Sequence, residues 1–101
     1  MTEKEFWKIL SHSRKSDWFV TALGQIRKRS GNGISSRVCP ICYVANKVRK
    51  SNNYTMDAVN ANDVLKLPHR FIQQIVLAAD NHLTDKHILN FRKRLHTTLG
   101  I

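Results

Sequence analysis

Two cysteines three positions apart are the residues whose chemistry has to be decided first. Cys39 and Cys42 stand in the run R-V-C-P-I-C-Y-V, with Pro40 and Ile41 between them. Thiols at this spacing serve as half of a zinc site, as a redox pair, or as small side chains that pack in a core. Each use demands different partners elsewhere in the chain.

A structural zinc ion needs four ligands, commonly a C-x2-C half and a pair of histidines. His82 and His87 have a suitable spacing, but they lie beyond two expected helices. The run D-N-H-L-T-D-K-H that contains them also suits a turn between two helices, where Asp and Asn act as caps. We therefore expect no cofactor. Zinc held by Cys39, Cys42, His82 and His87 is the alternative.

The redox interpretation starts from the spacing C-P-I-C at a helix start, which is similar to that of glutaredoxin-type proteins. In those proteins the helix N-terminus lowers the pKa of the first thiol, and a buried strand precedes it in a βαβ unit. Here the preceding residues I-S-S-R-V are polar, and no doubly wound pattern follows. The favoured interpretation is that both thiols pack, with Cys42 on the apolar face of a helix.

The elements that must position these residues are mainly helical. Thr2 and Glu5 form a capping box that starts a helix over about residues 3–13. Pro40 suits the first turn of a helix that reaches about Lys50. Its expected buried face comprises Ile41, Val44, Ala45 and Val48.

Three further helices are expected towards the C-terminus. Thr55 caps a short one through about Leu65, and Pro68 opens the next. Thr84 or Asp85 starts the last helix, and Gly100 ends it. The broad apolar faces of the last two helices comprise Phe71, Ile72, Ile75, Val76 and Ala79, and then Ile88, Phe91, Leu95 and Leu99.

The segment from Trp18 to Arg29 fits two patterns, because Phe19, Ala22, Leu23 and Ile26 match a helix face that Gly24 interrupts. Asn32-Gly33 indicates a tight reversal, since both residues tolerate positive φ. We expect a hairpin of residues 25–30 and 34–38. The fold class is therefore mainly α (α+β), with about five short helices and one small β-hairpin near residues 25–38, in a single basic domain over residues 1–101.

Positive charge dominates the composition, with 17 Lys and Arg against 7 Asp and Glu and a net charge of +10. Such an excess favours a polyanionic partner. No acid occurs from Trp18 to Met56, whereas a surface that only needs solubility mixes both signs. The partner-binding residues expected in this stretch are Arg27, Lys28, Arg29, Arg37, Lys47, Arg49 and Lys50.

A second basic cluster lies on the last helix, which also carries His87, Arg92 and His96. Its expected binding residues are Lys86, Lys93 and Arg94, opposite the apolar face. If the two clusters meet in space, they form a track for a phosphate backbone. The last two helices have the lengths of a helix-turn-helix reader, although a plain helical hairpin is favoured.

Several classes of protein are not expected from this sequence. No segment approaches the ~18 apolar residues of a membrane span. The N-terminus is typical of a helix start rather than a signal peptide, so the expected location is the cytoplasm, without a membrane partner. A phosphate-cradling loop, an H-E-x-x-H motif and a nucleophile elbow are all missing, and no enzyme is expected.

A set of short pieces resembles small phage and prophage proteins of unknown function. The pieces are Trp18, Gly24 with Ile26-Arg27, Cys39-Pro40-Ile41 with Val44-Ala45, the run 78–81 (A-A-D-N), and Leu99-Gly100-Ile101. That group more often carries a small hydroxyl residue at the position of Cys42, which speaks against zinc. The resemblance implies a mobile-element origin, with the host cytoplasm as location, and brings no catalytic residues.

The expected function is that of a non-enzymatic, phage-type binding protein that acts through its basic surface on DNA, RNA or a nucleoprotein complex. The first alternative is an anti-CRISPR-like inhibitor that binds mainly protein in a host defence or transcription complex. A charge of +10 excludes inhibition by acidic mimicry of nucleic acid. The second alternative is the small zinc-binding module.

Overall fold

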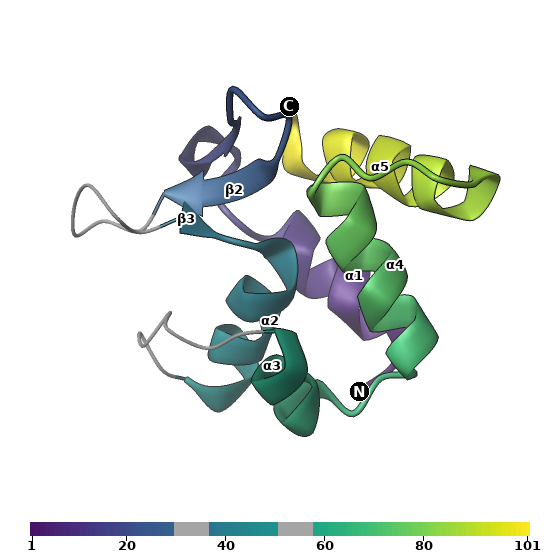
Figure 1. The fold of residues 1–101 in the computed structure, drawn as a ribbon. Helices are drawn as coiled ribbons and strands as arrows, with labels where there is room; N and C mark the ends of the chain where they lie inside the picture. Colours follow the sequence, from purple (N-terminus) through teal and green to yellow (C-terminus); the bar gives the residue numbers. More distant parts are fainter. Residues whose placement is uncertain (30–36, 51–57) are drawn as a thin grey trace.

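Helices make up most of the fold, and a small sheet joins the first helix to the second (Figure 1). The computed structural model describes residues 1–29, 37–50 and 58–101. In chain order these residues form α1 (Glu3–Ser11), the 3-10 turn η1 (Lys15–Asp17), β1 (Trp18–Val20), β2 (Ile26–Arg29), β3 (Arg37–Val38), α2 (Pro40–Arg49), α3 (Ala58–Leu65), α4 (His69–Ala79) and α5 (Lys86–Leu99). The expected mainly helical class with a small hairpin is confirmed.

Local capping signals set the start of α1 and both ends of α5. At the start of α1 the Glu5 N–H donates to Thr2 Oγ1 over 3.1 Å, and the Thr2 N–H donates to Glu5 Oε1 over 3.1 Å. Asp85 Oδ1 accepts from the Ile88 N–H over 2.9 Å at the start of α5. Gly100, with φ 71°, ends that helix in the left-handed region. The cap expected at Thr55 lies outside the described residues.

The sheet has three antiparallel strands in the order β1-β2-β3. β2 and β3 pair Lys28 with Val38 and Arg29 with Arg37, which is the expected hairpin. Its expected turn at Asn32-Gly33 lies outside the described residues. The third strand, β1, was not predicted from the sequence. The segment from Trp18 onward, which fitted two patterns, folds back on itself and pairs Trp18 with Lys28.

Gly24 explains why that segment is not a helix. It lies in the β1–β2 turn with φ 81°, a conformation that a side chain disfavours. The Thr21 N–H donates to the Gln25 carbonyl over 2.8 Å and closes the turn. A Cβ at Gly24 would lie 2.5 Å from Asn81 Nδ2, so the turn also packs closely against the end of α4.

The core forms one buried cluster around α1, which lies between α2 on one side and α5 on the other (Figure 1). Phe6 and Trp7 on α1 meet the Phe71 ring of α4 edge to face, with centroid distances of 5.4 and 6.5 Å. Phe91 on α5 stacks on Trp7 at 6.1 Å. The expected apolar faces of α4 and α5 therefore meet each other and α1.

One residue of the expected α2 face was assigned wrongly. Val48 is 42% exposed, because it lies at the edge of α2 where the helix leaves the core and borders a depression next to α1. Ile41, Val44 and Ala45 are fully buried, as predicted. None of the helices in the described ranges is long and apolar enough to cross a membrane.

Candidate nucleic-acid interface

Two of the expected interface cations of β2 are engaged within the fold. The Arg27 guanidinium pairs with the Asp80 carboxylate at the C-terminal end of α4, and its side chain is only 14% exposed. Lys28 Nζ lies 3.9 Å from Asp17 Oδ2 and 5.6 Å from the centroid of the Tyr43 ring. These contacts join β2 to α4, η1 and α2, so both cations contribute to the tertiary structure.

The other cations of the acid-free stretch whose side chains the structure describes are exposed. Arg29 lies over the Phe19 ring at 4.9 Å from its centroid, and Lys47 Nζ lies 5.6 Å from the centroid of Tyr43. Arg49 and Lys50 are exposed at the end of α2. The backbone of Arg37 in β3 pairs with that of Arg29 in β2, and the structure does not describe the Arg37 side chain.

The cluster on α5 divides into exposed cations and one buried cation. Lys86, Lys93 and Arg94 are exposed, as expected for a binding surface. Arg92 is buried, and its Nη1 donates to the carbonyls of Ala78 and Ala79 over 3.0 and 3.2 Å. Burial lowers its pKa. Arg92 therefore serves the C-terminal end of α4, whose carbonyls carry the negative end of the helix dipole.

A groove between α1 and α5 gathers cations that the sequence alone did not single out. We call it the α1–α5 groove; its volume is about 520 Å³, and it is lined by Lys4, Trp7, Lys8, Ser11, Lys15, Arg94, Thr97 and Thr98. None of these described lining residues is acidic. The guanidinium carbon of Arg94 lies over the Trp7 ring, 4.2 Å from its centroid.

The sequence did not predict binding residues in this N-terminal segment. Along the chain, the negative charges of Glu3 and Glu5 offset the positive charges of Lys4, Lys8 and Lys15. In space the Glu5 carboxylate turns to the helix start, where Thr2 Oγ1 donates to it over 3.0 Å. Hydrogen bonds from the Thr2 side chain and backbone hold the pKa of Glu5 below its usual value. The spacing of Lys4, Lys8 and Ser11 by four and three residues is the signal that marks one helix face.

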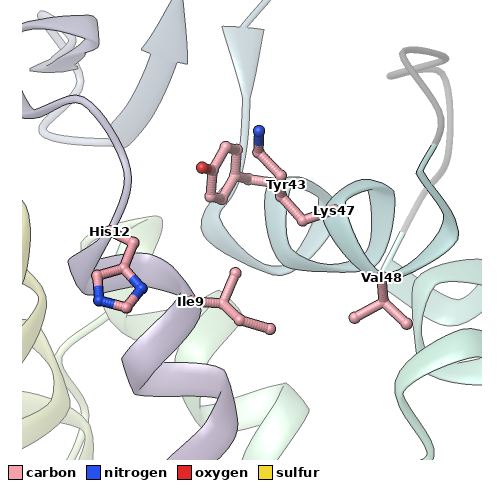
Figure 2. Close-up of a pocket in the computed structure, with 5 residues that line it drawn as sticks. All are labelled: Ile9, His12, Tyr43, Lys47 and Val48. Carbon is pink, nitrogen blue, oxygen red and sulfur yellow. The ribbon is translucent and has the colours of Figure 1, made fainter.

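A second depression lies on the other side of α1. Figure 2 shows Ile9 of α1 and His12, the residue after that helix, facing Tyr43, Lys47 and Val48 of α2 across a pocket of about 310 Å³, here called the α1–α2 pocket. No described residue that lines it is acidic. Residues of α1 therefore line both depressions, one with Arg94 of the α5 cluster and the other with Lys47 of the α2 cluster.

The structure does not assemble the alternative zinc site. Within the described residues, no three His, Cys, Asp or Glu side chains lie close enough to hold a metal ion. Cys39 and Cys42 are at the start of α2, whereas His82 and His87 are exposed around the start of α5. Both cysteines are thiols, and Cys42 is 6% exposed within the core, as the packing interpretation predicts.

Comparison of the chain with known protein families, with characterised proteins and with solved structures finds no match. The resemblance to small phage and prophage proteins therefore stays a prediction.

Proposed function

We propose that the protein is a non-enzymatic nucleic-acid-binding protein whose main contact surface is the α1–α5 groove. The observation that supports this most strongly is the gathering of Lys4, Lys8, Lys15 and Arg94 around one groove without an acid among its described lining residues. Phosphates repeat along every nucleic-acid backbone, and Lys and Arg contacts to them supply most of the affinity of non-specific binding. A net charge of +10 adds long-range attraction.

The chemistry of the groove suits a phosphate backbone with bases beside it. Three flexible lysine ammonium groups provide charge without fixed geometry, which fits phosphates at variable positions. Arg94 lies over the Trp7 ring, and a guanidinium group can stack on a base or donate to a phosphate. Thr97 and Thr98 add hydroxyl groups on the α5 side of the groove.

The path of the bound strand continues over α1 into the α1–α2 pocket. His12 and Lys47 offer nitrogen donors there, and Ile9 and Val48 offer apolar surface. Stacking and apolar contacts between charged positions are typical of proteins that bind nucleic acid without reading its sequence. The two basic clusters are then successive parts of one contact surface.

The direct test measures binding of labelled DNA and RNA strands by fluorescence anisotropy across a salt series. One variant carries Lys4→Gln, Lys8→Gln and Lys15→Gln. Its control carries Arg14→Gln, Lys66→Gln and Arg70→Gln, which removes equal charge from exposed positions outside the groove lining and outside both basic clusters. At about 50 mM salt the groove variant should bind about tenfold more weakly than the control. Its log–log salt slope should also be flatter, by about 0.7–0.9 for each phosphate that the variant no longer neutralises.

Two outcomes would contradict the proposal. Equal weakening of both variants would mean that binding follows net charge, so the groove is not the contact surface. No binding by the parent protein at low salt would exclude direct action on nucleic acid. The partner would then be a protein with an acidic surface, such as a host defence or transcription complex, and a pull-down that survives nuclease treatment would identify it.

A further inference from the structure

The two thiols at the start of α2 have unequal surroundings. Cys39 is the N-cap residue, with extended backbone angles (φ −76°, ψ 159°), and it is partly exposed. Cys42 lies one turn along, at the third helical position, and is almost fully buried. The Cys42 N–H donates to Cys39 Sγ over 3.5 Å. A partly exposed cysteine thus lies next to a buried one.

The N-cap position favours the ionised form of Cys39. A neutral thiol accepts hydrogen bonds weakly, whereas a thiolate at a helix N-terminus accepts charge-assisted ones. Hydrogen bonds from the Cys42 side chain and from the backbone N–H groups of Cys42 and Ile41, together with the field of Arg27, lower the pKa of Cys39 to about 7 against the opposing effect of burial. Pro40 has no N–H, so the first N–H donors of the helix are those that face this sulfur.

Packing alone accounts for Cys42 but not for Cys39. Ser, Thr, Asp, Asn and Gly are the residues favoured at an N-cap, and a cysteine there gains little as a neutral cap. A metal does not account for it either, because no third ligand lies near the pair within the described residues. What remains is the chemistry that two adjacent thiols perform together.

We propose that Cys39 and Cys42 form a thiol–disulfide exchange site, in which Cys39 attacks and Cys42 resolves, and whose substrates are small disulfides that can reach the partly exposed Cys39. This inference is independent of the proposed nucleic-acid binding. The thiolate is the reactive form, and exchange proceeds through a mixed disulfide.

The reaction balances in two steps. Cys39 Sγ attacks one sulfur of R–S–S–R, forms Cys39–S–S–R and releases R–S⁻, which takes up a proton from water. Cys42 then loses its proton to water and attacks Cys39 Sγ, releasing the second R–S⁻. Two protein thiols are oxidised by two electrons to one disulfide, and the small disulfide is reduced to two thiols. An excess of a dithiol reductant reverses the process.

The test follows the reduced protein with oxidised glutathione by intact mass spectrometry. The parent chain should end with an internal Cys39–Cys42 disulfide. Cys42→Ala should stop at one glutathione on Cys39, because the resolving thiol is gone. Cys39→Ala should react at least about tenfold more slowly, since the remaining thiol is buried. Circular dichroism checks folding, and Cys42→Ser serves as a second variant if Cys42→Ala is unfolded.

A pH series gives an independent readout on the parent chain. Alkylation of Cys39 by iodoacetamide, followed by peptide mapping, should rise with pH around a midpoint near 7, as the pKa of Cys39 implies. An unperturbed thiol titrates near about 8.5. The proposal is overturned if Cys39→Ala exchanges as fast as the parent, if the parent accumulates the mixed disulfide without closing it, or if both thiols stay inert until denaturant is added.

Discussion

Arg92 is a cation in a basic segment that serves the fold instead of a partner. Its guanidinium donates to two carbonyls at the end of α4 and through Nε to His96 Nε2 over 3.1 Å. From the sequence it belonged to the same cluster as Lys93 and Arg94, because helical spacing does not reveal a side chain that bends back to a neighbouring helix. Membership of a basic cluster in the sequence therefore does not place a side chain on the surface, and Arg92 was not among the binding residues expected on this helix.

Replacing Arg92 should reveal that structural role. Arg92→Met keeps much of the side-chain volume but leaves the carbonyls of Ala78 and Ala79 without this donor. Hydrogen bonds from charged groups contribute about 1.5–3 kcal/mol, so the free energy of unfolding should fall by about that amount in a urea titration. The exposed neighbour Lys93 provides the control, since Lys93→Met should change the free energy of unfolding by no more than about 0.5 kcal/mol. Equal urea midpoints for the two variants would show that the hydrogen bonds of Arg92 do not contribute to the free energy of unfolding.

At the scale of an element, the β1–β2 turn depends on Gly24. A side chain there would occupy a left-handed conformation and meet the amide of Asn81. Gly24→Ala should therefore lower the free energy of unfolding by about 1–3 kcal/mol in a thermal or urea titration.

The double variant with Asn81→Gly separates the two causes of that destabilisation. Asn81 itself has φ 66°, which glycine adopts freely. If the cost of Gly24→Ala persists in this background, it is backbone strain; if it shrinks, the contact with Asn81 contributed. A Gly24→Ala protein as stable as the parent would refute the account of the turn.

The sequence predicted helix ends better than it predicted strands, for a physical reason. Caps such as Thr2 with Glu5, or Asp85, are satisfied by atoms a few residues away, so a local pattern suffices. β1 exists only through its pairing with β2, and its residue Phe19 fits a helix face together with Ala22, Leu23 and Ile26 when the sequence is read alone. Short strands stabilised by distant packing leave little local signal.

At the scale of the whole molecule, the interface depends on packing between distant segments. The acid-free stretch pointed to Lys47 and Arg29, which are exposed, but not to Lys4, Lys8 and Lys15. Those three lysines line the α1–α5 groove together with Arg94, because α5, near the other end of the chain, packs on α1. Counting charges along the sequence cannot predict that these distant residues lie together.

The position of Trp7 beneath Arg94 gives the chain an optical probe of its own binding surface. The only other indole, Trp18, is 4% exposed and donates through Nε1 to Ser13 Oγ over 2.8 Å, away from the groove lining. A ligand that draws Arg94 off the ring should change the emission of Trp7 and leave that of Trp18 constant. Trp18→Phe should thus retain the fluorescence response to added nucleic acid, and Trp7→Phe should abolish it. The reverse pattern would place the ligand elsewhere; the expected one would make titration of the unlabelled protein a direct reading of groove occupancy.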